Sequence, residues 1–190
     1  MHVILETPRL VLRELMVDDL DFVAELLAHP EVMRFWPRPY THEEAIEWIR
    51  RQQGRYASDG FGYWLTLEGE TGRPIGQAGL LRQEFDGVVE TGIGYILHRP
   101  FWGHGFATEA ALACRDHAFG KLGKLRVTAA VRPENLASRR VAERIGLKCE
   151  RMTTLAEMPH MLYAATQPRL PAAQPGDEEG RRQRKADAAR

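Results

Sequence analysis

A short turn with two glycines one residue apart constrains this chain more than any other part of its sequence. The turn reads Trp102-Gly103-His104-Gly105-Phe106-Ala107. It follows a segment, 91–97, whose alternating small and large apolar residues predict a strand, and it precedes an Ala- and Leu-rich segment, 107–119, that predicts a helix. Glycine lets the backbone approach a ligand closely, and the unpaired amides at a helix start attract negative charge. The pattern therefore favours a site for a phosphate-bearing ligand.

Two common phosphate-binding motifs do not account for this turn. A dinucleotide-binding fingerprint requires a glycine or alanine at the sixth position from Gly103, but Thr108 stands there. The fingerprint also needs an acidic residue about 20 positions further on, in a stretch that here reads Lys-Leu-Arg-Val. A P-loop would need a Gly-Lys-Ser/Thr sequence, which this turn lacks. A general nucleotide-binding protein is therefore disfavoured.

Composition narrows the class of protein further. The 190 residues are 44% hydrophobic, enough for one domain with a core, and they carry 26 basic and 26 acidic side chains. No net charge therefore recruits nucleic acid or an anionic membrane. Cys114 and Cys149 have neither metal-ligand nor disulfide spacing, and we expect no metal site. No signal peptide or membrane span is evident, so we expect a soluble, cytoplasmic protein without nucleic-acid or membrane partners.

The order of predicted elements indicates an α/β (α+β) fold in residues 1–167. The pattern runs strand, two helices, three strands, helix, strand, helix, two strands. The three consecutive strands are separated by short turns and predict an antiparallel meander. The predicted strands are 9–13, 63–67, 75–81, 91–97, 126–131, 148–153 and 160–165, and the predicted helices are 18–28, a helix opened by the capping box at 41–44, 107–119 and 136–145. Residues 168–190, rich in proline and charge, predict a disordered tail.

A second segment, 132–147, has the form of a well-capped helix. Asn135 stands where an N-cap belongs, Ser138 lies in the first turn, and Gly146 follows the last turn. Taken alone, this segment needs no ligand to explain it. Its chemical interest depends on its position one strand after the glycine turn.

In this order, the glycine turn and the Glu-Asn-x-x-Ser-Arg-Arg segment closely resemble the GCN5-related N-acetyltransferase (GNAT) superfamily. The chain is most similar to the branch that includes the ribosomal-protein alanine N-acetyltransferases. The segments Thr-Pro-Arg-Leu-Val-Leu-Arg at 7–13 and Glu-Val-Met-Arg-Phe at 31–35 are similar as well, so the resemblance covers residues 6–166. It implies a mixed, mostly antiparallel sheet of six to seven strands with about four helices, splayed between the fourth strand (91–97) and the fifth (126–131).

The resemblance implies acetyl-CoA as the acyl donor. Its diphosphate would bind the backbone amides of the turn, and its pantetheine arm would enter the gap beside the fourth strand. Asn135 and Ser138 match residues that reach the pantetheine and the thioester sulfur. Pro100 stands where the family usually has Gln or Arg, which puts in doubt only a side-chain role at that position. The implied binding residues are Tyr95, Ile96, Leu97, Trp102, Gly103, His104, Gly105, Phe106, Ala107, Asn135 and Ser138.

The implied reaction is direct attack of a primary amine on the thioester in a ternary complex, for which the amine must lose a proton. The branch often has a glutamate at the position of Gly92. Glu90 lies on the same face of the predicted strand, about 6–7 Å away, and is the predicted general base. An ordered water, Glu84 or Asp86 remain alternatives. Ser138 is the predicted proton donor to the leaving thiolate, and Asn135 the third predicted catalytic residue.

The acceptor site is expected to form from the first two helices, the aromatic loop 35–40 between them and the C-terminal hairpin near His160. Phe35, Trp36, Tyr40 and His160 are its predicted residues. The aromatic loop either lines a pocket or fills the core, and His160 is either a strand-end residue or a base. The acceptor is a protein N-terminus or a small-molecule amine, and the chain is a monomer or a homodimer. Gly92 motivates an alternative function, a catalytically silent acyl-CoA-binding sensor or partner subunit.

Overall fold

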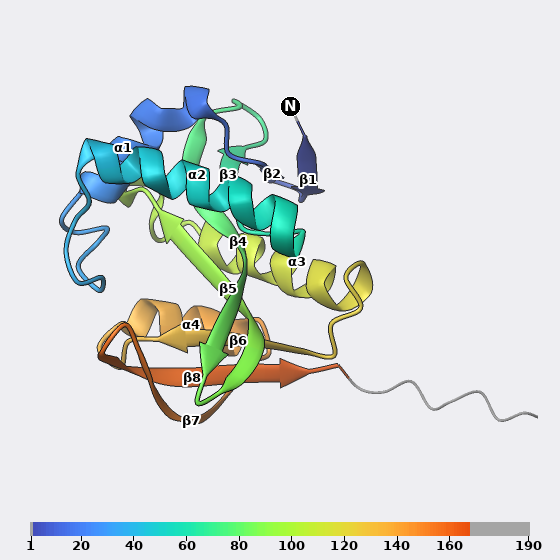
Figure 1. Ribbon diagram of the computed structural model, residues 1–190. Coiled ribbons are helices and arrows are strands. Elements are labelled where there is room, and N and C mark those ends of the chain that lie inside the picture. The colour runs from blue at the N-terminus through green and yellow to red at the C-terminus, as the bar shows by residue number, and fades with distance from the viewer. Residues whose placement is uncertain (1, 168–190) are drawn as a thin grey trace, which may run out of the picture.

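Eight strands form one twisted sheet in the computed structural model, which describes residues 2–167 (Figure 1). The predicted tail at 168–190 lies outside the described residues. The strands are β1 (Val3–Glu6), β2 (Leu10–Arg13), β3 (Tyr63–Glu68), β4 (Pro74–Phe85), β5 (Val88–Leu97), β6 (Arg126–Val131), β7 (Lys148–Leu155) and β8 (Met158–Thr166). The helices are α1 (Leu20–Ala28), α2 (His42–Asp59), α3 (Phe106–Gly120) and α4 (Leu136–Arg144), with one-turn 3-10 helices at Val17–Asp19 and Arg99–Phe101.

The sheet opens between β5 and β6. Its strand order is β1-β2-β3-β4-β5-β6-β8-β7, and only β5 and β6 run parallel within this described sheet. Strands β4 and β5 pair at ten positions, from Gly76–Leu97 to Phe85–Val88. In contrast, the register of β5 with β6 contains the single pair Gly92–Thr128. The last residues of β5 therefore lack ladder partners on β6, which confirms the predicted splay at this place.

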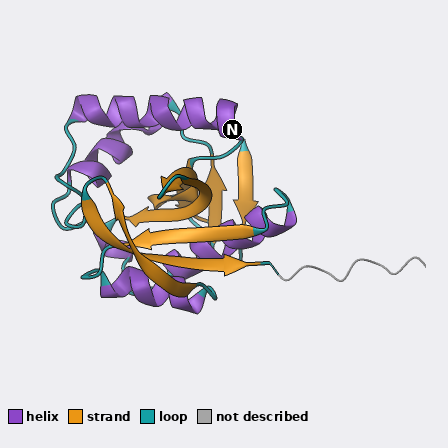
Figure 2. Cartoon of the chain, turned by 60° about the horizontal axis from the view of Figure 1, so that its bottom comes forward, coloured by secondary structure: helices purple, strands orange, loops and turns teal. Residues whose placement is uncertain are grey.

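Helices cover both faces of the sheet (Figure 2). Helices α1 and α2 pack on one face, against Tyr63 and Leu65, whereas α3 and α4 pack on the other, which includes Trp64. Successive residues of β3 contact opposite helix layers because the side chains of a strand alternate between its two faces. The predicted capping box begins α2, since Thr41 accepts from the backbone of Glu44, whose side chain bonds back. No helix within residues 2–167 combines the length and the apolar character needed to cross a membrane.

The sheet has eight strands, one more than the seven predicted by residue range. Strand β1 pairs with β2 at the sheet edge, with only four residues, two of them exposed. So short an edge strand has little apolar pattern by which a sequence can identify it. The other seven strands and the four helices occur where they were predicted, and the hairpin between β4 and β5 turns through Asp86 and Gly87, both with positive φ.

Candidate active site

The glycine turn joins the open end of β5 to α3. After Arg99–Phe101 the chain turns through Gly103 and Gly105, whose φ values of 80° and 82° lie in the left-handed region that side chains disfavour. Gly105 is the N-cap of α3 and has no side chain to bond the helix amides. The first amides of α3 are therefore available to an external acceptor, as a phosphate site requires.

An ion pair holds the turn against the loop between β1 and β2. Arg9 Nε donates to Glu109 Oε2 (2.7 Å), and Arg9 Nη1 donates to the carbonyl of His104 (3.1 Å). The Arg9 guanidinium also lies 4.6 Å from the centroid of the Phe106 ring. Although partial burial favours a neutral Glu109, hydrogen bonds from Thr7 and Arg9 lower the pKa of this carboxyl. Arg9 thus connects the loop before β2 to the backbone of the turn itself.

Two side chains of the turn also pack locally. Trp102 Nε1 donates to the carbonyl of Leu97 (2.8 Å), which folds the turn back onto the end of β5. The His104 ring stacks on Phe106, with centroids 6.0 Å apart. His104 therefore faces its neighbour and does not line the cavity beside the turn.

A cavity of about 370 Å³ adjoins the glycine turn, and we call it the turn cavity. All residues predicted to bind the acyl donor line it, except His104. Three arginines, Arg34, Arg140 and Arg144, contribute positive charge to its wall, while the lining residue Glu31 is paired with Arg99. The predicted residues at its wall are Tyr95, Ile96, Leu97, Trp102, Gly103, Gly105, Phe106, Ala107, Asn135 and Ser138.

A second cavity of about 310 Å³ lies toward α2 and the β7–β8 hairpin, and we call it the aromatic cavity. The four residues predicted to bind the acceptor, Phe35, Trp36, Tyr40 and His160, all line it. Trp36 and Tyr40 also pack edge-on against Trp48, each with ring centroids 5.8 Å apart. Both alternatives for the aromatic loop are therefore realised, because its rings line a cavity and contact the α2 side of the core.

The two cavities meet at five residues that line both, Phe35, Trp36, Tyr95, Asn135 and Ser138, which we call the shared wall. Asn135 is the N-cap of α4, where its Oδ1 accepts from the backbone N–H of Ser138 (3.1 Å). The Tyr95 hydroxyl donates to the carbonyl of Ser138 (3.2 Å). Burial raises the pKa of Tyr95 to about 12, so its hydroxyl keeps its proton at neutral pH.

His160 is buried in the wall of the aromatic cavity. Its Nδ1 lies 2.8 Å from the carbonyl of Met158, and since a carbonyl only accepts, Nδ1 must carry the proton. The neutral ring then has its lone pair on Nε2. Burial, aided by the positive charge of Arg132 and opposed by the Met158 hydrogen bond and Glu134, lowers the pKa of His160. His160 is therefore a neutral proton acceptor at pH 7.

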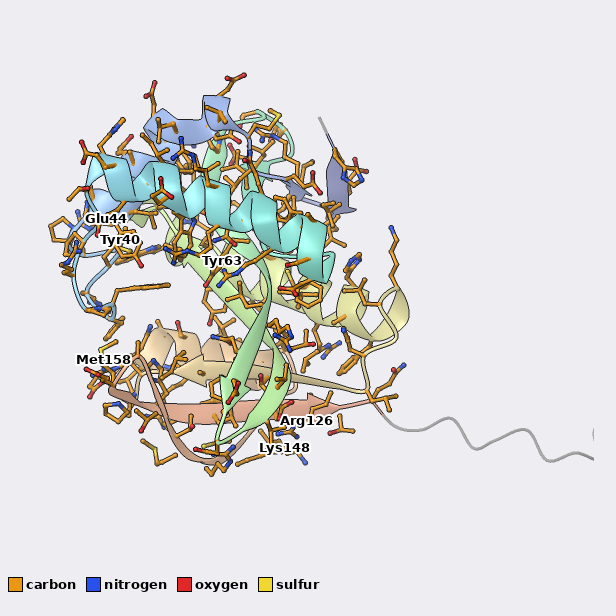
Figure 3. The ribbon with its side chains drawn as sticks, in the orientation of Figure 1. Tyr40, Glu44, Tyr63, Arg126, Lys148 and Met158 are labelled. Atoms are coloured by element: carbon orange, nitrogen blue, oxygen red, sulfur yellow. The ribbon has the colours of Figure 1, made fainter. Side chains whose placement is uncertain are left out.

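Glu90, the predicted base, is not brought to either cavity. Its Oε1 accepts from Arg126 Nε (3.0 Å), and Arg126 also binds Glu150. Figure 3 shows Arg126 at the opposite end of the β6–β8 layer from Met158. Strand spacing placed Glu90 on the same face of β5 as Gly92 but could not reveal Arg126, which comes from the next strand of the sheet.

Several charged residues of the site were not predicted from the sequence. Arg51 and Arg55 of α2 and Arg132 after β6 line the aromatic cavity, together with Gln83 and Tyr63. Arginines on an amphipathic helix ordinarily face solvent, so their pattern gives no signal of a site. The alternatives to Glu90 as base, Glu84 and Asp86, line neither cavity.

Comparison with known proteins agrees with this geometry. A family model described as an acetyltransferase (GNAT) domain matches residues 9–148. The uncharacterized N-acetyltransferase p20 of Bacillus licheniformis is 33% identical over 138 residues, which cover 70% of this chain and 76% of that protein.

Solved structures share the fold. An acetyltransferase from Agrobacterium tumefaciens is 30% identical, with a TM-score of 0.77 over 88% of this chain and 95% of that one. RimL, a ribosomal L7/L12 alpha-N-protein acetyltransferase solved in complex with coenzyme A, is 19% identical, with a TM-score of 0.73 over 87% and 98% of the two chains. At that identity the second likeness concerns the fold alone.

Proposed function

Because this chain belongs to the GNAT family of acetyltransferases, which take their acetyl group from acetyl-CoA, we propose that it acetylates a primary amine by direct attack in a ternary complex. The shared wall carries this proposal. A thioester held in the turn cavity and an amine held in the aromatic cavity would meet at Tyr95, Asn135 and Ser138. Such proximity converts a bimolecular reaction into an effectively unimolecular one.

The turn cavity suits an acylated pantetheine that carries a diphosphate. The amides at the start of α3 would bind the diphosphate, with Arg140 and Arg144 adding positive charge beside it. The backbone of Tyr95–Leu97, which pairs with β4 but has no ladder partner on β6, would bond the pantetheine arm on its β6 side, and an amide near Ile96 would polarise the thioester carbonyl. Asn135 keeps its Nδ2 donors for the same arm, because only its Oδ1 is used in the helix cap.

The reaction needs two proton transfers. A C–N bond forms as the amine attacks the thioester carbon, the C–S bond breaks, the amine loses a proton and the leaving thiolate gains one. We assign the first transfer to His160 Nε2 and the second to the Ser138 hydroxyl, each directly or through water. This assignment moves the base from Glu90 to His160, because only His160 lines the aromatic cavity.

A transfer assay tests this function. The purified chain is incubated with acetyl-CoA and a panel of primary amines that includes peptides with free N-termini, polyamines, aminoglycosides and amino acids. Release of free thiol is measured together with the mass of the acetylated product. We expect amine-dependent thiol release with a mass gain of one acetyl group on the amine nitrogen.

The same assay separates the enzyme from a catalytically silent sensor. A sensor would bind acetyl-CoA, measured by calorimetry, yet release no thiol with any amine above the rate without amine. Gly92, at the family's usual acidic position, is the residue that motivates this alternative. A Cβ at Gly92 would lie only 2.0 Å from Gln83 Oε1, so Gln83 occupies the space that an acidic side chain would need.

The ion pair that holds the turn gives a smaller, graded prediction. Glu109→Gln keeps the side-chain shape but removes the charge that binds Arg9, so the turn should lose part of its anchoring. We expect the KM for acetyl-CoA to rise about three- to tenfold, as for a partly buried charge-assisted pair, with kcat little changed. Steady-state kinetics at saturating amine measures both constants.

The control is Glu47→Gln, which removes an exposed glutamate paired with Arg50 on the surface of α2. This variant should leave the KM for acetyl-CoA unchanged. Equal KM values for the Glu109 variant and the wild-type protein would show that the turn does not depend on this pair.

A further inference from the structure

The aromatic cavity is positively charged. Arg51, Arg55 and Arg132 line it, and among the described residues that line it there is no aspartate or glutamate. Burial raises the pKa of Tyr63 and Tyr95 and lowers the pKa of His160, so these three lining groups are neutral at pH 7. A bound amine would therefore meet cations and aromatic rings, and no carboxylate to hold it as an ammonium ion.

The Arg55 guanidinium is partly buried without an anionic partner among the described residues. Its side chain is half-buried, and its Nη1 donates to the neutral amide oxygen of Gln52 (3.2 Å). Burial lowers the pKa of Arg55, and the charge of Arg51, one helical turn earlier, lowers it further, against the opposing effects of Tyr63 and Asp59. Within residues 2–167 neither arginine forms an ion pair. Two like charges four residues apart destabilise a helix. An anion bound between them would offset this repulsion by its attraction to both.

Arg132 approaches the same cavity from the loop that follows β6. Its side chain is one-fifth exposed, and its buried Nε has no hydrogen-bond partner among the described residues. The carboxylate of Glu134 lies 3.5 Å from Nε, within ion-pair range, but is itself mostly exposed. A buried guanidinium nitrogen without a hydrogen bond is costly, and an anionic acceptor in the cavity would satisfy it.

Resting on the function proposed above, we propose that the acceptor is a small amine that carries an anionic group, a carboxylate or a phosphonate, and has the size of one amino acid. The guanidinium groups of Arg51, Arg55 and Arg132 bind the anionic group, and the rings of Trp36, Tyr40 and Trp48 contact the rest of the molecule. The cavity of about 310 Å³ is at the lower limit of the usual range for ligand sites, which favours a compact acceptor over an aminoglycoside.

This charge distribution also assists the chemistry. Nearby cations disfavour an ammonium ion and so lower the pKa of a bound amine, which increases the fraction that is neutral and able to attack. The same cations repel polyamines, whose several positive charges cannot all be neutralised at the amine-binding end. Recognition of the anion and activation of the amine therefore come from one set of residues.

Matched pairs of acceptors test the proposal. Glutamate, aspartate and methionine are each compared with their α-amides, and aminomethylphosphonate, spermidine and a peptide with an acidic N-terminal residue complete the set. We expect kcat/KM for the carboxylate forms to exceed that for the amides by about tenfold or more, the usual value of a hydrogen bond to a charged group. Arg55→Gln should bring the two values together by raising the KM of the carboxylate form alone, whereas Arg50→Gln, on the surface of α2, should change neither.

Tryptophan fluorescence gives a readout that does not require turnover. Trp36 and Trp48 line the cavity, so N-acetylglutamate, a product analogue, should change their emission in the wild-type chain and not in Arg55→Gln, while its diamide should have little effect in either. Thiol release that is equal or faster with amides, spermidine or the peptide overturns the anionic small-molecule acceptor but leaves the acetyltransferase intact. Emission that responds to N-acetylglutamate without thiol release from any amine would instead contradict the transfer function.

Discussion

Gly105→Val is expected to raise the KM for acetyl-CoA by about 30-fold, because a β-branched residue in the left-handed region costs about 2 kcal/mol and drives the turn out of shape. Gly105 has φ +82° and is the N-cap of α3. Any relief of the strain reorients the amides of Phe106 and Ala107, the groups proposed to bind the diphosphate. Its new side chain also begins 3.5 Å from Arg9 Nη2, the guanidinium that anchors the turn. Steady-state kinetics and calorimetric titration with acetyl-CoA measure the effect.

Gly123→Val is the matched control. Gly123 also has a left-handed φ, +61°, with open space around its Cβ position, but it lines neither cavity. The two variants should lose similar stability in thermal unfolding, while only Gly105→Val loses affinity for acetyl-CoA. A Gly105→Val protein that binds acetyl-CoA as tightly as the wild type would remove the glycine turn from the donor site.

His160→Gln is expected to lower kcat by about 10²- to 10⁴-fold, the range typical of a lost general base, with the KM for acetyl-CoA little changed. Glutamine keeps a donor and an acceptor at this place but cannot take up a proton at neutral pH. His160 is buried in the aromatic cavity, and its Nδ1 bond to Met158 leaves Nε2 as the acceptor. Single-turnover measurement of acetyl transfer separates this step from product release.

The direction in which the rate changes with pH gives a second test of His160 as the general base. Because burial lowers the pKa of His160, the ring stays neutral below its ordinary titration range. Titration of His160 should therefore cause no pH dependence of the rate at pH 7–8, and the rate should fall only as the pH drops through the lowered pKa, where imidazolium forms and cannot accept a proton. The His160→Gln variant should lack this acidic limb, and His42→Gln, at the exposed start of α2, should keep it. An acidic limb that persists without His160 would assign the titration to another group.

The fold and most residues that line the turn cavity were predictable because their signals are local. The glycine turn at 102–107 requires only two residues with positive φ and a following helix. The helix start at 135–138 requires only its Asn cap. Both patterns can therefore be recognised in the sequence. The splay of β5 from β6 came from the family resemblance, not from residue pattern. Strand β1 was missed because four residues at an edge leave little periodicity.

The residues that line the aromatic cavity were less predictable because tertiary contacts between distant parts of the chain bring them together. Periodicity placed Glu90 on a face of β5, yet its partner Arg126 comes from another strand and holds it outside both cavities. Arg51 and Arg55 belong to the polar side of an amphipathic helix, and only the packing of α2 over β3 directs them to a cavity. His160 was predicted at the acceptor site, but the role proposed for it as proton acceptor depends on a bond to Met158, two residues away, that sequence alone does not specify.

A crystal structure with acetyl-CoA bound tests the central idea most directly, namely that donor and acceptor meet where the two cavities join. We expect density for the diphosphate at the amides of residues 103–107, for pantetheine beside Tyr95–Leu97, and for the acetyl carbon at Ser138, facing the cavity that His160 lines. Density for the coenzyme at any other surface, or an acetyl group directed away from Asn135 and Ser138, would contradict it.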